Sequence, residues 1–228
     1  ELCDEIDNDC DGLIDQLDND FDQLLTTYYA DADGDGKSEV FVGTEYSTPL
    51  TVHNFDGSFR WSTFEEVGSE GNATTPRRGI CLKHMVLIDL DSDGVEEIVY
   101  GTEDGWIFAV NPHEGEELWH LNIAGEVTGL VVHSKGIIAT NEFGFVFSIN
   151  YSGEVSWHHR VADWISHLAS NETCVTIARD REHVSKLADD GNITDSYNVG
   201  DQINHLRGRD RFFICATAKG SLIRIDTE

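Results

Sequence analysis

Two short stretches of the chain carry acidic side chains at the spacing that calcium-binding loops use. They run from Asp31 to Glu39 and from Asp89 to Glu97, and both have the form D-x-D-x-D-G-x-x-E. In such a loop the acids supply carboxylate ligands, the residue after the glycine supplies a backbone carbonyl, and the glycine permits a sharp turn. Because calcium takes about six to eight oxygen ligands, both stretches are predicted to bind Ca²⁺.

Each of these two loops leads directly into an apolar run, at residues 40–42 and 98–100. Bound calcium would therefore fix the turn between two strands, and without it the clustered acids would repel one another. The expected ligands of one loop are Asp31, Asp33, Asp35, Glu39 and the carbonyl oxygen of Lys37. Those of the other loop are Asp89, Asp91, Asp93, Glu97 and the carbonyl oxygen of Val95.

A third acidic stretch lies near the start of the chain, where Cys3 and Cys10 bracket part of it and could close a small disulfide. Its expected calcium ligands are Asp7, Asp9, Asp11, the Leu13 carbonyl, Asp15 and Asp18. So short a segment has little core of its own. Residues 1–24 are therefore interpreted as an appendage stabilised by its metal and by the Cys3–Cys10 bridge, with a solvated turn as the alternative.

The rest of the chain is an internal repeat, which predicts the fold. A turn glycine recurs at intervals of 38 residues, at Gly115, Gly153 and Gly191, with an earlier copy at Gly57. A second apolar marker keeps the same interval, at Val127, Ile165 and Ile203. Two independent markers in one register make coincidence a poor explanation.

Within one repeat, β-branched and aromatic runs alternate with Gly, Asp and Asn turns, at residues 85–89, 97–101, 106–111 and 117–122. Four short strands in about 40 residues are typical of a propeller blade. We therefore predict an all-β fold, with β-propeller blades over residues 25–228. Five units of about four strands are expected to begin near Thr26, Gly79, Glu126, Trp164 and Gln202.

The last unit is expected to lack its outermost strand, because the next turn glycine would fall at 229 and the sequence stops at Glu228. An unpaired sheet edge is normally avoided or used for pairing with a partner. Two interpretations stay open. The chain is a piece of a longer propeller, or another segment or subunit supplies the strand and permits self-association.

Three tryptophans, Trp61, Trp119 and Trp157, occupy one position of the repeat, so they are expected to pack between blades rather than to bind sugars. Trp164 lies outside this register. The remaining cysteines, Cys81, Cys174 and Cys215, stand in apolar runs and are expected to be small buried side chains.

The formal net charge of -28 would repel nucleic acid and anionic lipid. Calcium ligands explain part of this excess, and a solvating acidic surface would explain the rest. No apolar run is long enough to predict a membrane span. Four glycosylation sequons, at Asn72, Asn150, Asn171 and Asn192, favour an exported glycoprotein.

Several segments resemble known families. Residues 104–119 and 143–157 resemble the propeller repeat of quinoprotein-like (PQQ-like) domains. Residues 31–43 and 89–101 look like the calcium loops of FG-GAP repeats in integrin-alpha-type propellers. The segment from Cys3 to Asp15 is similar to a cysteine-bracketed metal-binding repeat of microbial surface proteins, from which it departs at Glu5, where that motif usually has Gly. All three resemblances imply an extracellular or cell-surface setting.

The sequence contains no H-E-x-x-H, no Cys/His zinc spacing, no G-x-S-x-G and no adjacent cysteine pair, so we do not expect an enzyme. We predict a secreted or cell-surface calcium-binding propeller with a structural, adhesive or scaffold role, recognising a protein or glycan partner. Two alternatives remain: a carbohydrate-binding module, and a fragment of a quinone-dependent dehydrogenase-like propeller.

Overall fold

The computed structural model describes residues 26–30, 39–43, 50–63 and 81–226. Four of the sequence predictions lie outside the described residues. They concern the acidic stretch Asp7–Asp18, the Cys3–Cys10 bridge, Asn72 and most of the loop before Glu39. Every element within the described residues is a β-strand, which confirms the all-β prediction. The strands form five antiparallel sheets, each numbered here as a blade in chain order.

The first two blades have four strands each. Blade 1 consists of β1 (Thr26–Ala30), β2 (Glu39–Gly43), β3 (Leu50–Asn54) and β4 (Phe59–Ser62). Blade 2 consists of β5 (Leu82–Ile88), β6 (Glu97–Thr102), β7 (Trp106–Val110) and β8 (Glu117–Asn122). The first strand of blade 2 begins three residues before the expected Met85, because a bulge near His84 lets Leu82 pair with Thr102.

The next two blades repeat this order, and the last has three strands. Blade 3 consists of β9 (Val127–His133), β10 (Gly136–Asn141), β11 (Phe145–Ile149) and β12 (Val155–Arg160). Blade 4 consists of β13 (Ile165–Ser170), β14 (Val175–Arg179), β15 (His183–Leu187) and β16 (Ile193–Asn198). Blade 5 consists of β17 (Ile203–Arg209), β18 (Phe212–Thr217) and β19 (Leu222–Asp226).

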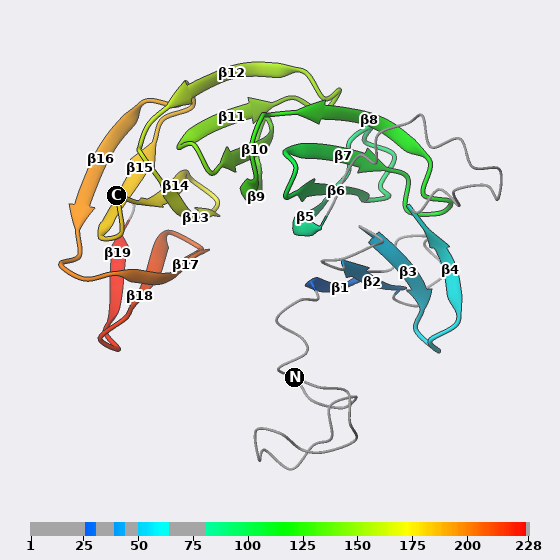
Figure 1. Cartoon of the computed structure of the whole chain (residues 1–228), viewed down its shortest axis with the longest axis horizontal. Helices are drawn as coiled ribbons and strands as arrows, with labels where there is room; N and C mark the ends of the chain where they lie inside the picture. Colours follow the sequence, from blue (N-terminus) through cyan, green and yellow to red (C-terminus); the bar gives the residue numbers. More distant parts are fainter. Residues whose placement is uncertain (1–25, 31–38, 44–49, 64–80, 227–228) are drawn as a thin grey trace, which may run out of the picture.

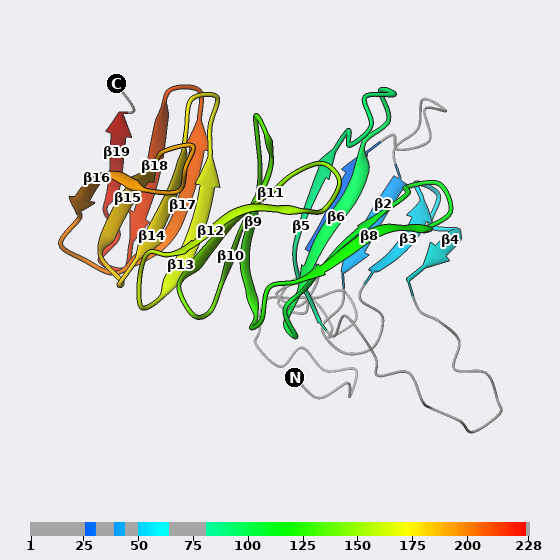
Figure 2. The ribbon, with the colours of Figure 1, turned by 90° about the horizontal axis from the view of Figure 1, so that it is seen from above.

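The five blades stand side by side in an open arc (Figure 1). The first strand of each blade lies on the inside of the arc, and β8, β12 and β16 lie along its outer rim. Neighbouring inner strands contact one another from β1 through β5, β9 and β13 to β17. Figure 2 shows the same sheets from above, each packed against the next. The predicted blade starts are therefore confirmed to within about three residues.

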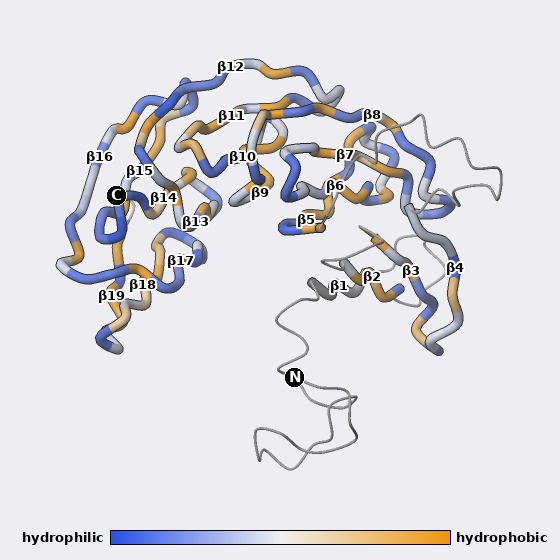
Figure 3. The backbone as a smooth tube through the Cα atoms, viewed as in Figure 1, coloured by the Kyte–Doolittle hydropathy of each residue, from blue (hydrophilic) through white to orange (hydrophobic). Residues whose placement is uncertain are grey.

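The hydrophobic core lies between the blades. The middle strands β6 and β10 are buried along their whole length, whereas β16 on the rim is exposed along its whole length. A middle strand is covered on both faces by neighbouring sheets, so nearly every residue in it is apolar or small. One cluster joins Val99 and Ile107 of blade 2 to Ile137 and Ile149 of blade 3. Figure 3 shows the apolar residues gathered in the inner and middle strands.

The repeated tryptophans join each blade to the next, as the sequence predicts. Each indole Nε1 donates a hydrogen bond to a backbone carbonyl in the turn between the third and fourth strands of the following blade. The three bonds are Trp61 to Pro112 at 3.0 Å, Trp119 to Tyr151 at 3.1 Å and Trp157 to Asp189 at 2.8 Å. Blade 4 has Asp195 at the corresponding position and lacks this contact.

The prediction for the cysteines is right at two positions and wrong at the third. Cys174 and Cys215 are buried, and both belong to the apolar cluster between blades 4 and 5. Cys81 is only partly buried and has a φ of 57°, because it lies in the turn that leads into β5 rather than inside a strand.

Candidate metal centre

The acidic loop of residues 89–96 connects β5 to β6 and is here called the blade 2 loop. Ile88 and Glu97, which flank it, face each other across the two strands. In blade 1, Ala30 and Glu39 face each other in the same way. The two acidic sequences therefore stand at the same joint of neighbouring blades, as the repeat predicts.

Side-chain carboxylates and backbone amides hold the blade 2 loop in a tight coil. The Asp89 carboxylate accepts hydrogen bonds from the backbone N–H groups of Ser92, at 2.6 Å, and of Gly94, at 3.1 Å. Asp91 and Asp93 each accept one from the residue two positions on, at 3.1 and 2.7 Å. Gly94 has a φ of 92°, a conformation that L side chains rarely adopt, which explains a glycine there.

Three of the predicted ligands converge. Asp89, Asp91 and Glu97 each offer a carboxylate oxygen, and these oxygens all lie within 4.8 Å of one another. Calcium–oxygen bonds are about 2.3–2.6 Å long, so oxygens on opposite sides of one ion lie about 5 Å apart. The spacing and the all-oxygen donor set therefore fit a hard cation such as calcium.

The other two predicted ligands of this loop are arranged differently. Asp93 is not one of the three converging acids, and its Oδ1 atom accepts the hydrogen bond from the N–H group of Val95. That hydrogen bond fixes the turn from which the Val95 carbonyl oxygen would bind a cation. A carboxylate has further lone pairs, so the hydrogen bond does not exhaust the capacity of Asp93 as a ligand.

Glu97 is the buried member of the group. Only 4% of this residue is exposed, and its Oε2 atom accepts a hydrogen bond of 2.7 Å from the backbone N–H of Leu90. Burial raises the pKa of the Glu97 carboxyl, and the nearby charges of Asp91 and Asp93 raise it further. Among the described residues Glu97 has no ion-pair partner, so a cation at this point would offset an unfavourable charge.

Glu39 is the described member of the loop in blade 1, and it is also buried, with 2% exposed. Unlike Glu97, it has a basic neighbour, because the Arg60 guanidinium on β4 lies 3.3 Å from its Oε1 atom. Arg60 was not expected from the sequence. One sequence feature could have indicated this contact. Arg60 is the residue directly before Trp61 in the repeat, and the equivalent position in the other blades holds no basic residue.

Three glycosylation sequons are described, and their asparagines differ in accessibility. Asn192 is exposed, in the turn between β15 and β16. Asn150 is partly buried, and its side-chain amide bonds to the Glu154 carboxylate at 3.1 Å. Asn171 holds a turn through its side-chain oxygen, and its Nδ2 atom is buried without a hydrogen-bond partner.

Histidines recur on the inner strands, where the repeat places His84, His167 and His205 at one position. Burial lowers the pKa of His84 to about 4, and the charges of Lys83 and His167 act in the same direction. Burial also lowers the pKa of His167, whose ring centroid lies 6.0 Å from that of His205. His84 and His167 are thus partly buried on their strands whereas His205 is exposed, and the lowered pKa of His84 keeps its ring neutral at pH 7.

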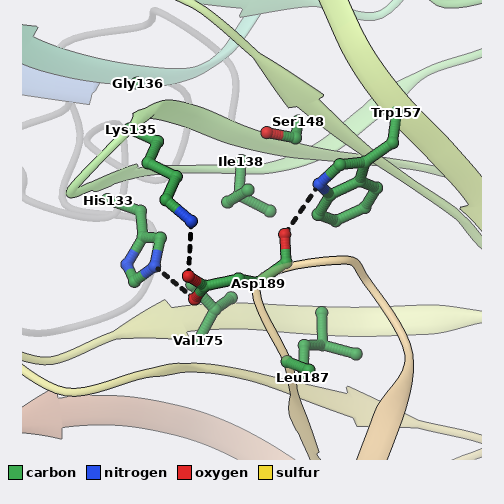
Figure 4. A pocket seen from close by; sticks show the side chains of 10 residues that line it. His133, Lys135, Gly136, Ile138, Ser148, Trp157, Val175, Leu187 and Asp189 are labelled. Carbon is green, nitrogen blue, oxygen red and sulfur yellow. Dashed lines mark hydrogen bonds and ion pairs between the residues drawn. The ribbon is translucent and has the colours of Figure 1, made fainter.

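A small pocket lies between blades 3 and 4 (Figure 4). The Asp189 carboxylate accepts a hydrogen bond of 2.5 Å from the Lys135 ammonium and lies 3.7 Å from the His133 imidazole. The backbone carbonyl of Asp189 accepts the hydrogen bond from the Trp157 indole. Lys135 lies in the turn between the first two strands of blade 3, where blade 2 has the acidic loop. The pocket is thus part of the contact between two blades.

Comparison with solved structures supports the propeller architecture. The crystal structure of BBS1N in complex with ARL6DN matches with a TM-score of 0.63 and 13% identity, over 89% of this chain and 77% of that one. The computationally designed Ika8 protein matches with a TM-score of 0.66 and 16% identity, over 89% and 58%. Sqt1 of Saccharomyces cerevisiae matches with a TM-score of 0.68 and 12% identity, over 83% and 56%.

No protein-family model matches the sequence, and neither does any curated protein. At identities this low the structural matches show the fold alone. The chain has a β-propeller fold. None of the described residues forms a helix that could cross a membrane.

Proposed function

We propose that the chain is a secreted or cell-surface propeller in which calcium binds the blade 2 loop and stiffens the joint between β5 and β6. Its role is structural, adhesive or scaffold-forming, and not catalytic. One observation carries the calcium assignment: the carboxylates of Asp89, Asp91 and Glu97 converge, and Glu97 is buried without an ion-pair partner among the described residues.

Calcium at this point would act on packing as well as on charge. Leu90, inside the loop, packs against the apolar cluster that joins blade 2 to blade 3. A bound ion that fixes the loop would therefore also hold Leu90 in the joint between the two blades. The metal would replace apolar packing that a polar loop cannot provide by itself.

A thermal melt in calcium and in chelator tests the calcium assignment. Calcium that binds only the folded state must raise the melting temperature, and the increase must grow with calcium concentration. Magnesium at equal concentration is the control, because it prefers a near-ideal octahedral site and keeps several of its waters. Equal melting temperatures in calcium and chelator would refute the assignment.

A protein partner is the second part of the proposal. One of the similar structures is a complex of BBS1N with ARL6DN, so a propeller of this shape binds another protein there. Blade 5 has three described strands, and β19 pairs only with β18 on one side. An added strand at the other edge of β19 would complete the blade, from a partner or from a second copy of the chain.

A glycan is the alternative partner, favoured by two exposed aromatic side chains on loops that Arg160 links. Trp164 and Phe143 are 45% and 52% exposed. Arg160 links their loops, because its guanidinium donates to the Phe143 carbonyl and to the Asp163 carboxylate. Aromatic faces of this kind stack on sugars, and a glycan array on the protein and on Trp164→Ala would test the alternative. Equal signals from both proteins would exclude this site.

A further inference from the structure

Blade 5 stands at one end of the arc, and one face of its sheet turns away from blade 4 (Figure 1). The opposite face packs against blade 4, because Phe213 and Cys215 of β18 belong to the apolar cluster between these two blades. Side chains alternate along a strand, so Phe212, Ile214 and Ala216 lie on the face that turns away, which is here called the distal face. Ile214 is 38% exposed, so the described residues leave this face open to solvent.

A row of three paired residues crosses the equivalent face of each blade from blade 2 onward. The rows are Val86, Val99 and Ala109 in blade 2; Val131, Ile138 and Ser148 in blade 3; Ala169, Thr176 and Lys186 in blade 4; and Arg207, Ile214 and Arg224 in blade 5. In blades 2 and 3 the row is uncharged, and its apolar members belong to the clusters that join each blade to the next. In blade 4 it has one basic residue. In blade 5 it has two, so the distal face differs from the faces that form joints.

The two arginines of the row in blade 5 are held differently. Arg207 is exposed and has no ion-pair partner among the described residues. The Arg224 guanidinium lies over the Phe212 ring, 4.2 Å from its centroid, and its Nε and Nη2 atoms each lie 2.7 Å from Oδ1 of Asp226. These contacts orient the guanidinium before any partner binds, which lowers the entropy that a partner must overcome.

The distal face is basic in a protein that is otherwise strongly acidic. The chain has 43 acidic residues against 15 basic ones, yet more than half of the basic residues lie from Arg179 to Arg224. On β17, Arg209 pairs with Phe212 and so extends the basic edge of the distal face. Its nearest acid, Asp210, lies 4.0 Å away in an exposed pair, which compensates little of the charge.

Another blade of this repeat would fit the distal face poorly. At the described joints the following blade offers a pair of apolar side chains: Ile98 and Val110, Ile137 and Ile149, Val175 and Leu187, or Phe213 and Ile225. Blade 1, at the other end of the arc, has Val40 and His53 in this place, so a second copy docked end to end would also bring no carboxylate. Burying two guanidiniums against such side chains would leave their charge unpaired, which is strongly unfavourable.

We propose that the distal face of blade 5 binds an acidic segment of a partner protein. Its carboxylates pair with Arg207 and Arg224, because a planar carboxylate matches the donors of a guanidinium. Its apolar side chains cover Ile214 and Leu222, which is 78% exposed. This binding rests on the proposed function only in requiring a protein partner, and it is independent of the calcium site.

A labelled peptide of alternating glutamate and valine residues is the probe, and fluorescence anisotropy in chelator measures its binding to the full chain. In an extended strand of this sequence all the carboxylates lie on one face. The same peptide with glutamine in place of glutamate is the control. We expect saturable binding of the glutamate peptide alone, weakened by added salt. The net charge of -28 repels acidic peptides in general, so such binding would report a local basic site.

A charge reversal in the row locates the binding. Arg207→Glu should weaken the binding of the glutamate peptide about tenfold, because it replaces an attractive charge with a repulsive one. Arg181→Glu makes the same change at an exposed arginine in a turn of blade 4, and it should leave the affinity unchanged. Both arginines are exposed, so both variants should keep the melting temperature of the unmodified protein.

Three results would overturn the proposal. The glutamate peptide does not bind, or it binds Arg207→Glu and Arg181→Glu equally well, or light scattering shows a self-association of the chain that Arg207→Glu abolishes. The last result would mean that a second copy occupies the distal face.

The proposed function can fail separately. Equal binding of the two peptides would indicate strand addition at β19 without a role for the arginines, so the distal face would be excluded and the partner strand supported. A melting temperature that does not respond to calcium would refute the calcium assignment alone, because the peptide measurements are made in chelator.

Discussion

The indole Nε1 of Trp157 donates a hydrogen bond of 2.8 Å to the backbone carbonyl of Asp189, which belongs to the next blade. The same ring packs on Gly191, where an added Cβ would lie 2.5 Å from ring carbon Cζ3. Trp61 and Trp119 make equivalent contacts with Gly115 and Gly153. The two markers of the sequence repeat, a turn glycine and an outer-strand tryptophan, are therefore the two sides of one contact between blades.

Removing this contact should lower the stability of the fold most at Trp61, which is the most buried of the three tryptophans. We expect Trp61→Ala to lower the free energy of unfolding by about 3–5 kcal/mol, since it removes a large buried ring. Trp61→Phe keeps much of the packing but leaves the Pro112 carbonyl without its donor, at a cost of about 1 kcal/mol or more. Denaturant unfolding would measure both. Trp164→Ala, at an exposed tryptophan, should stay within about 0.5 kcal/mol, and an equal loss there would contradict the structure.

A pair of glycines separates backbone strain from the tryptophan contact. Gly57 and Gly153 hold the same turn position and have φ angles of +82° and +81°. A Cβ at Gly57 would meet nothing within 4 Å, whereas one at Gly153 would lie 2.6 Å from Trp119. Both alanine variants pay the cost of positive φ, about 1 kcal/mol, and only Gly153→Ala also displaces the ring. We expect the melting temperature of Gly153→Ala to be several degrees below that of Gly57→Ala. Equal melting temperatures would be inconsistent with the packing of Trp119 on Gly153.

Glu97→Gln should act in opposite directions with and without calcium. In chelator it should raise the melting temperature, because it removes a buried carboxylate beside Asp91 and Asp93. In saturating calcium it should lower the temperature relative to the unmodified protein, because a charged ligand is lost. Glu114→Gln, at an exposed acid outside the loop, should show neither effect. A shift of one sign in both conditions would argue against a metal ligand.

The stability of the fold should depend on His84 between pH 6.5 and about 4. The folded-state pKa is below the ordinary value, so in this window the unfolded chain binds more protons. The free energy of unfolding therefore falls as the pH is lowered, and this loss is complete below about pH 4. The difference between the ordinary pKa of 6.5 and the folded-state pKa of about 4 corresponds to a loss of at most about 3 kcal/mol in the free energy of unfolding.

Unfolding curves at several pH values would test this dependence. Other carboxylates titrate in the same range, so the informative quantity is the difference between His84→Gln and the unmodified protein. That difference should shrink or change sign as the pH falls. His113→Gln, at an exposed histidine, is the control. Parallel curves for all three proteins would show that His84 is not held neutral by burial.

Glycosylation, if the chain passes through a eukaryotic secretory pathway, should favour Asn192 over Asn171. Asn192 is exposed, whereas the Nδ2 atom of Asn171 is buried and its side-chain oxygen holds a turn. Peptide mass spectrometry of protein expressed in such a host would measure occupancy at each site. Higher occupancy at Asn171 than at Asn192 would mean that this turn is open when the glycan is transferred.

Much of the fold could be predicted because the repeat has a fixed length. Turn glycines spaced by 38 residues set the boundaries of the blades, and the start of β5 at Leu82 was the main error. That strand is longer than expected because a bulge continues its pairing past His84. A bulge depends on the partner strand, so local sequence gives little sign of it.

The candidate site was predictable in its composition and less so in its geometry. The spacing identified Asp89, Asp91 and Glu97, which do converge. It gave equal weight to Asp93, whose carboxylate is not one of the three that converge. Nothing in the loop sequence pointed to Arg60, because the contact with Glu39 spans 21 residues and crosses β3.

The sequence by itself determined the strand period, the blade boundaries and the two acidic joints, since these depend on local spacing and turn chemistry. Only the tertiary structure decided which acids are buried and what faces them. Glu39 and Glu97 look identical in their motifs, yet Glu39 lies beside a guanidinium, and Glu97 has none beside it among the described residues. Burial and charge compensation arise when distant strands pack together, so they depend on residues that no local motif contains.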